Sequence, residues 1–292
     1  MGNGFNSFHP YVIFFYYVEV GFLSMYFRHP LFLGTIVLIL ALVNITHDGG
    51  KTLKKWLPIY ILMTTVIIIL NPFLVSRGTN ILFYFRGKQV TVEATMYGLV
   101  MSLSILAILI MFLSFNLILN GNKFLYIFSR ILPRTAFLTM IAIRYVPLLR
   151  DRLEEITTVQ RVRQMTISSG TLKERVKSGM LIIQVLFTWS LEEAIQTADS
   201  MKARGYGIGE KTSYTRYMMQ KRDWIWLIII VFLFIICVAG GGLGYGKIVI
   251  YPQLGTLHLY PIDWLIYCCT FIIIAFPLIV EGREYILWKY LK

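Results

Sequence analysis

Six long apolar runs constrain this chain of 292 residues more than any other feature. A bilayer core of about 30 Å requires a helix of about 20 apolar residues. Backbone groups in lipid must hydrogen-bond within their own segment, so such runs predict transmembrane helices. The fold class expected is all-α, a polytopic membrane protein with about six transmembrane helices and a cytoplasmic set of amphipathic helices. The six runs cover residues 11–27, 31–46, 57–75, 96–119, 224–239 and 264–280.

The composition excludes an ordinary soluble domain. Apolar residues make up 57% of the chain and charged residues 15%, whereas soluble domains have about 45–50% and about 25%. The three cysteines lie inside apolar runs and form no CxxC pair, so we interpret them as small buried side chains. The four histidines show no spacing typical of metal ligands, and no metal site is expected.

The first apolar run is a membrane span and not a signal peptide. It lacks a basic leading region and a small-residue cleavage site. Its one unusual residue is Glu19, because an acid inside the membrane is costly and suggests function by default. The spans contain no second acid or base to form a relay, which favours a carboxylate that faces other helices.

A seventh apolar stretch, residues 136–149, is too short to span the bilayer and contains Arg144 and Pro147. It is expected to be the start of a helix that leaves the membrane.

The basic residues orient the chain. The net charge is +13, which is unusual for so apolar a protein. With both termini in the cytoplasm, 23 of the 28 Lys and Arg residues fall on the cytoplasmic side, as the positive-inside rule requires. Fourteen of these lie in one long loop, residues 144–222, and long loops count for less in this rule. The charge therefore indicates topology and a protein-binding surface, and no nucleic-acid partner is expected.

The sequence pattern of this long loop, residues 144–222, predicts that it contains helices. Thr171 to Glu174 and Ser190 to Glu193 both fit the S/T-x-x-E capping box. Apolar residues follow each box at helical spacing. Three amphipathic helices are therefore expected: one from about Arg144 to Met165, and one after each box. Gly205 is expected to end the third as its C′ residue.

The apolar faces of these helices must be covered by lipid, by each other or by a partner. Binding to anionic lipid is one alternative. It is disfavoured because eight acidic residues are interspersed in the loop and no run of four to eight basic residues is present.

Residues 241–247 read G-x-x-x-x-G-K, like a phosphate-binding loop. Ile248 stands where Ser or Thr should hold magnesium, and the stretch follows a membrane span instead of a strand. We interpret it as a glycine-rich exit from a helix.

Three segments resemble the transmembrane T component of energy-coupling factor (ECF) transporters, which are ABC-type importers of vitamins and metal ions. The most specific is Ala-Asp-Ser-Met-Lys-Ala-Arg-Gly-Tyr-Gly at residues 198–207, which resembles the family's second Ala-Arg-Gly signature. Residues 141–149 are similar to the family's lead into its coupling helices. Asn71-Pro72-Phe73, with Ser76 to Thr79, resembles a third segment between two spans.

The family's first signature is altered in this chain. Its position reads Val162-Arg163-Gln164, so the arginine is kept while Ala and Gly are replaced. Either Arg161 or Arg163 could be the central residue. Arg163 is favoured because the family's layout has a glutamine three residues before the arginine, and Gln160 stands three residues before Arg163.

The resemblance implies a coupling subunit that is not itself an enzyme and holds no cofactor, because partners bind the ATP and magnesium. The implied partners are two ABC ATPase subunits and a membrane-embedded S component that binds the substrate. The implied organisation is membrane helices one to four in residues 1–135, a coupling-helix domain in 136–222, and helices five and six with a cytoplasmic tail in 223–292. The implied ATPase-coupling residues are Val162, Arg163, Gln164, Ala203, Arg204 and Gly205.

Two other classes of protein remain as alternatives. A membrane enzyme would need paired carboxylates or histidines at the membrane surface. Asp151, Glu154 and Glu155 share one helical stretch and could hold a metal, but Arg150 and Arg152 interleave with them, which favours a solvated face. A channel or self-contained transporter is the other alternative, although no inverted repeat or pair of broken helices stands out.

Overall fold

The computed structural model describes residues 4–75, 77–85, 88–162, 171–208, 217–255 and 258–290. The chain divides into two compact units. The first combines Met1–Phe124 with Tyr217–Lys292, and the second is Leu125–Arg216.

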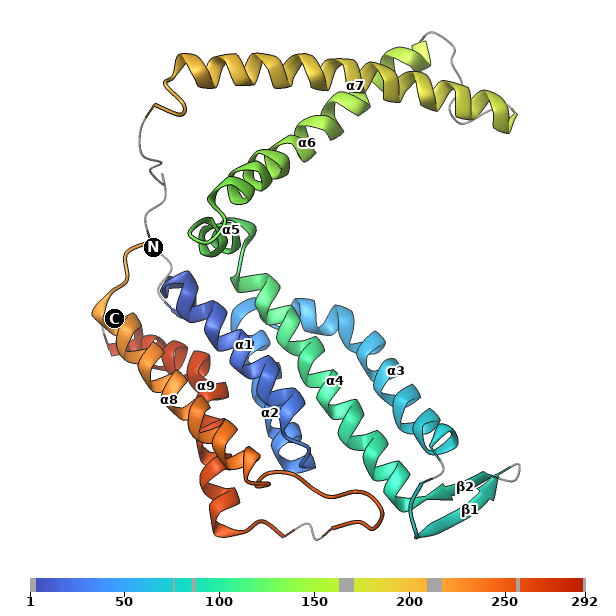
Figure 1. The fold of residues 1–292 in the computed structure, drawn as a ribbon, viewed down its shortest axis with the longest axis vertical. Coiled ribbons are helices and arrows are strands. Elements are labelled where there is room, and N and C mark those ends of the chain that lie inside the picture. The colour runs from blue at the N-terminus through green and yellow to red at the C-terminus, as the bar shows by residue number, and fades with distance from the viewer. Residues whose placement is uncertain are drawn as a thin grey trace. The chain divides into compact units, whose positions relative to one another are not determined.

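The first unit is a helical bundle (Figure 1). Within it, α4 packs against α1, α2 and α3, while α9 packs against α1, α2 and α8. Each of α1 and α2 begins with proline at its first position, where the missing amide costs no hydrogen bond. The helices are α1 (Pro10–Tyr26), α2 (Pro30–Asp48), α3 (Lys51–Leu74), α4 (Val92–Ile118), α8 (Lys221–Gly242) and α9 (Pro261–Tyr290).

The prediction of an all-α polytopic membrane protein is confirmed. Among the described residues, five helices are long and apolar enough to cross a membrane, namely α2, α3, α4, α8 and the Pro261–Glu284 part of α9. The sixth predicted span is α1, whose 17 residues reach the lower limit for a spanning helix.

An aromatic cluster closes one end of the bundle. Phe5 lies in a short 3-10 helix, η1 (Phe5–Ser7), and is fully buried. Its ring contacts Tyr16 at 5.4 Å and Phe276 at 5.3 Å between centroids, both edge to face, an arrangement that adds to the gain from burial. The Tyr16 hydroxyl donates to the Ile274 carbonyl at 3.0 Å, so its polar atom is satisfied inside the bundle.

Several polar side chains within the spans face the bundle interior. Glu19 is only 4% exposed, as the sequence led us to expect for a carboxylate that faces other helices. Asn44 donates to the Ile110 carbonyl at 3.1 Å and thereby links α2 to α4. Tyr17 and Ser114 form a hydrogen bond of 2.6 Å between α1 and α4.

A β-hairpin joins α3 to α4, and the sequence analysis did not anticipate it. Strand β1 (Ile81–Phe85) pairs antiparallel with β2 (Lys88–Thr91). The register places Phe83 opposite Val90 and Tyr84 opposite Gln89. The hairpin stands at the end of the bundle where α3 ends and α4 begins (Figure 1).

The second unit contains two long helices, α6 (Pro133–Val162) and α7 (Leu172–Ala203), and a shorter helix, α5 (Gly121–Ser129), leads into it. Residues 136–149 lie in the first half of α6 and are thus part of a longer helix. That this helix leaves the membrane stays a prediction. The helix begins at Pro133, well before the predicted start near Arg144, and passes through Pro147 without ending.

The prediction of a third amphipathic helix is wrong, because α7 is continuous across the second capping box. The Ser190 hydroxyl donates to the Leu186 carbonyl at 2.7 Å, which is a bond inside a helix and not a cap. No proline interrupts Leu172–Ala203, and extending a formed helix costs less than nucleating a new one. The first box does form the helix start, where the Thr171 amide donates to Glu174 at 3.0 Å.

Gly241 allows α8 to pack against α1. A Cβ atom at this position would overlap the Tyr26 ring. This ring cannot easily move aside, because the Tyr26 hydroxyl donates to the Val238 carbonyl at 3.1 Å.

Gly241→Ala should therefore destabilise the bundle by about 1–3 kcal/mol, the usual cost of overpacking. The measurement is the apparent melting temperature of the purified protein in mild detergent. Gly34→Ala is the matched control, since a Cβ there meets nothing within 4 Å and alanine favours the helix. A melting temperature for Gly241→Ala that equals that of the native protein would contradict this account.

Candidate functional site

Helices α6 and α7 pair through three side-chain contacts in antiparallel order. The rings of Phe137 and Tyr206 stack at 5.1 Å. Further along α6, Tyr145 and Thr197 share a hydrogen bond of 3.0 Å. Beyond it, the Arg152 guanidinium lies 4.6 Å from the centre of the Trp189 ring, a cation–π contact. From the first contact to the third, the residue on α6 moves toward the C-terminus while its partner moves toward the N-terminus. The two helices therefore run in opposite directions.

The C-terminus of α7 is a Schellman motif, which confirms Gly205 as the C′ residue. The Tyr206 amide donates to the Met201 carbonyl at 3.0 Å, and the Gly205 amide donates to the Lys202 carbonyl at 2.9 Å. Gly205 has φ +79°, a conformation that a side chain disfavours. The glycine of the signature therefore has a structural function: it turns the chain sharply after Arg204.

Arg204 is the C-cap residue of α7 and its side chain is exposed. The guanidinium forms no ion pair or hydrogen bond with any residue that the structure describes. Ala203, just before it, is also exposed. A planar, permanently charged group thus stands free at a helix end, where it could pair with a carboxylate of another chain.

The other predicted contact is only partly described. Val162 is the last residue of α6 and is 81% exposed. Arg163 and Gln164 lie outside the described residues, so their place as the altered first signature stays a prediction. Arg161, the alternative central residue, lies exposed in the last turn of α6.

Helix α7 also carries an apolar stripe that its own unit leaves uncovered. The stripe residues recur at intervals of three or four, so they share one side of the helix. Each is half exposed or more. The members are Leu172, Val176, Met180, Ile183, Phe187, Leu191 and Ile195.

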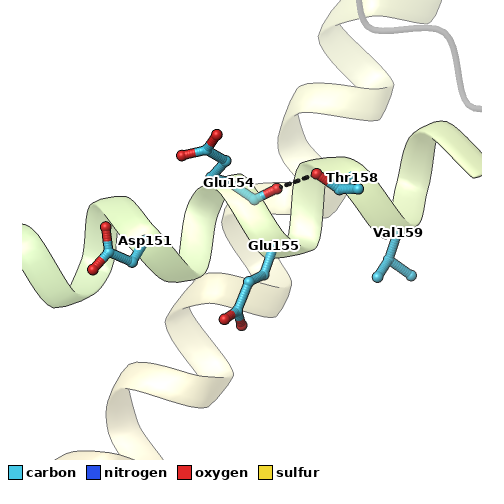
Figure 2. A pocket seen from close by; sticks show the side chains of 5 residues that line it. All are labelled: Asp151, Glu154, Glu155, Thr158 and Val159. Atoms are coloured by element: carbon cyan, nitrogen blue, oxygen red, sulfur yellow. Dashed lines mark hydrogen bonds between the residues drawn. The ribbon is translucent and has the colours of Figure 1, made fainter.

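The acidic residues on α6 do not converge on one point. A shallow hollow of about 400 Å³ lies beside Asp151, Glu154, Glu155, Thr158 and Val159, but the three carboxylates point in different directions (Figure 2). Glu155 accepts from Arg152 at 2.6 Å. Within the part of the chain that the structure describes, no cluster of three or more His, Cys, Asp or Glu residues is suited to a metal ion. The arrangement fits a solvated face.

In the first unit, the family-like segment after α3 is tied to the start of α4. The Thr91 hydroxyl donates to the Arg77 carbonyl at 2.6 Å. The buried Glu93 carboxylate accepts from the Thr79 amide at 3.3 Å and from the Asn80 amide at 3.1 Å. This segment therefore orders the link between two helices, and Ser76 within it lies outside the described residues.

The glycine-rich stretch after α8 is not arranged as a phosphate site. The Gly246 amide donates to the Asp263 carboxylate at 2.9 Å, so a negative group already occupies this donor. Lys247 lies 3.9 Å from the centre of the Tyr26 ring. Both contacts agree with our interpretation of residues 241–247 as a helix exit.

The sequence analysis missed the residues that hold α6 and α7 together. Tyr206 belongs to the signature, yet its stacking on Phe137 joins residues far apart in the chain. In the sequence Arg152 only separates acidic residues, whereas in the structure it contacts both Trp189 and Glu155. Each of the three contacts contains at least one aromatic ring, which is the only signal that the sequence offers for them.

Comparison with known families gives a match over most of the chain. The family described as CbiQ, cobalt transport protein, matches residues 11–215. That range includes α1 from its second residue, α2 to α4, and both helices of the candidate site.

Individual relatives carry the name energy-coupling factor transporter transmembrane protein EcfT. The chain is 27% identical to that of Staphylococcus aureus over 223 residues, which cover 72% of this chain and 82% of the relative. It is 27% identical to that of Lacticaseibacillus paracasei over 230 residues, which cover 72% and 83%. A shorter match to the Bacillus subtilis protein is 33% identical over 89 residues, covering 30% and 34%.

Gly205→Ala should loosen the end of α7. Placing a side chain in the left-handed region costs about 1–2 kcal/mol, which corresponds to about five- to thirtyfold faster local opening. Hydrogen–deuterium exchange of a peptide covering residues 200–208 measures this opening. Gly205→Asn is the matched variant, because asparagine tolerates this conformation and should exchange more slowly than the alanine variant. Equal protection in native and alanine forms would refute the structural role of this glycine.

Proposed function

The chain belongs to the CbiQ family of cobalt transport proteins, and from this premise we propose that it is the energy-coupling transmembrane subunit of an ECF-type ABC importer. In this proposal it links ATP hydrolysis by two cytosolic ATPase subunits to the reorientation of an S component, for the uptake of vitamins or metal ions. Relatives named energy-coupling factor transporter transmembrane protein support this assignment.

The observation that carries the proposal is the position of Arg204. It caps α7, is exposed, and leaves every donor of its guanidinium unused by the described residues. Its fork of donors suits bidentate pairing with a carboxylate. In the proposed mechanism, Ala203, Arg204 and Gly205 enter a groove on one ATPase. Residues 162–164, of which Val162 is the last residue of α6, enter the other.

The S component is proposed to lie against the apolar stripe of α7. The stripe is continuous from Leu172 to Ile195, and its exposed fractions range from 50% at Ile183 to 79% at Leu172. A partner that is itself embedded in the membrane would cover such a surface by hydrophobic contact, which is non-directional. A contact of this kind lets one coupling subunit move its partner without specific polar bonds.

The chemistry is proposed to reside in the partners. The ATPases would hold ATP and magnesium, and this subunit would have neither a cofactor nor a catalytic residue. It would transmit motion: closure of the ATPases displaces the ends of α6 and α7, and these helices displace the S component.

Arg204→Ala should weaken the complex at one ATPase. Removing one partner of a buried ion pair costs about 3–5 kcal/mol, a loss of about a hundredfold or more in affinity. Co-purification in mild detergent, read by quantitative mass spectrometry, measures the ATPase chains retained per copy of this subunit. Arg204→Lys should retain less than the native protein, because lysine lacks the bidentate fork.

Lys202→Ala is the matched control for this experiment, since it removes an exposed cation from the same helix turn. It should leave the complex intact. If Arg204→Ala retains both ATPase chains as well as the native protein does, the proposed contact is wrong.

The proposed orientation places both termini and the α6–α7 unit in the cytoplasm. A cysteine in place of Ile208, which is 86% exposed, should then react with a membrane-impermeant maleimide only when the reagent reaches the cytoplasmic side. A cysteine in place of the exposed Gln253, between α8 and α9, should react only from outside. The background needs Cys237, Cys268 and Cys269 replaced. The reverse labelling pattern would overturn the orientation.

A further inference from the structure

The β1–β2 hairpin has an apolar surface that its own unit leaves open. Four consecutive residues of β1 have large exposed fractions: 43% at Ile81, 55% at Leu82, 50% at Phe83 and 64% at Tyr84. Successive side chains of a strand point to opposite faces. Phe83 and Tyr84 are therefore apolar residues on the two different faces of the hairpin, and both faces are open.

Water is an unsuitable environment for such a strand. An antiparallel ribbon with one face in water normally alternates apolar and polar residues, and an isolated two-stranded hairpin is marginally stable at best. Strand β2 is held by the bundle, because Val90 and Thr91 are buried at 2% and 0%. Strand β1 is the outer strand, so its side chains require another cover.

The position of the hairpin indicates what that cover is. It directly joins α3 and α4, which are both long and apolar enough to span a membrane. In Figure 1 it extends sideways from the start of α4 and not along the axis of that helix. Only 6% of the spanning part of α3 is buried, so this apolar helix beside the hairpin is left uncovered by its own unit as well.

Other residues at this end of the bundle agree. Tyr260 and Trp264 stand at the start of α9 and are 67% and 54% exposed. Trp and Tyr are enriched at membrane–water interfaces, where an apolar ring and a polar atom meet suitable surroundings. An interfacial belt at this level would also include Tyr84 of the hairpin.

We infer that the β1–β2 hairpin lies in the membrane interface at this end of the bundle, with the side chains of β1 inserted among lipid headgroups and upper acyl chains. The backbone limits its depth. The outer edge of β1 presents unpaired amide and carbonyl groups, and such an edge is not tolerated in the hydrocarbon core. In the headgroup region, water and lipid polar groups can satisfy it. The hairpin is therefore a shallow lipid anchor and not a membrane-spanning element.

The test places a single environment-sensitive fluorophore on the hairpin. Phe83→Cys and Tyr84→Cys, each in a background without the three native cysteines, are labelled and reconstituted with their co-purifying partners in vesicles of phosphatidylethanolamine and phosphatidylglycerol. Quenching is compared for lipids with a nitroxide near the headgroup, lipids with a nitroxide near the chain end, and aqueous iodide. Leu62→Cys, in the exposed middle of α3, is the deep control, and Gln253→Cys is the aqueous control.

Both hairpin labels should be quenched more by the shallow nitroxide than by the deep one, and severalfold less by iodide than the label at Gln253. Iodide quenching equal to that at Gln253 would place the hairpin in water and overturn the inference. Stronger quenching by the deep nitroxide would overturn the proposed depth. A label shielded from both lipid and iodide would show that a protein covers this surface, which would also overturn it.

Discussion

The absence of water in the hydrocarbon core is the constraint on which the rest of this structure depends. Every backbone amide and carbonyl that crosses the core needs a partner within the protein, so the crossing segments are helices. The same constraint acts on side chains. Tyr16 satisfies its hydroxyl on the Ile274 carbonyl, and Asn44 reaches the Ile110 carbonyl. Polar atoms thus join helices to one another, and most of the basic residues lie outside the six apolar runs.

Much of the bundle follows from the sequence for this reason. Hydropathy and segment length are local properties, and they predicted α1, α2, α4 and α8 to within about four residues at each end. Helix α3 begins at Lys51, before the predicted start at residue 57, and α9 continues to Tyr290, beyond the predicted end at residue 280. The hairpin could not be predicted in this way. Ile81 to Phe85 is an apolar run too short to span, and periodicity alone does not separate a short buried helix from a strand. Its strand pairing depends on Val90 and Thr91 being held by the bundle, which is a tertiary effect.

The candidate site shows the same division between local and distant information. The end of α7 was predictable, because a glycine after a helix and a basic last turn are local signals. The second capping box was misleading, since Ser190 to Glu193 has the right letters but lies within a helix that has no reason to stop. The contacts from Phe137 to Tyr206 and from Arg152 to Trp189 join distant segments, and no local pattern specifies them.

The continuity of α7 has a mechanical consequence. Its 32 residues form a rod of about 48 Å at the usual helical rise, and no proline softens it. The apolar stripe and the Arg204 tip belong to this one stiff body. Because the contacts with α6 reach from Trp189 to Tyr206, a force applied at the tip would move α7 together with α6. The part of the stripe from Leu172 to Phe187 lies beyond those contacts and would be carried along by the stiff helix. Two shorter helices joined by a hinge would absorb such a force by bending, whereas a single helix works as a lever.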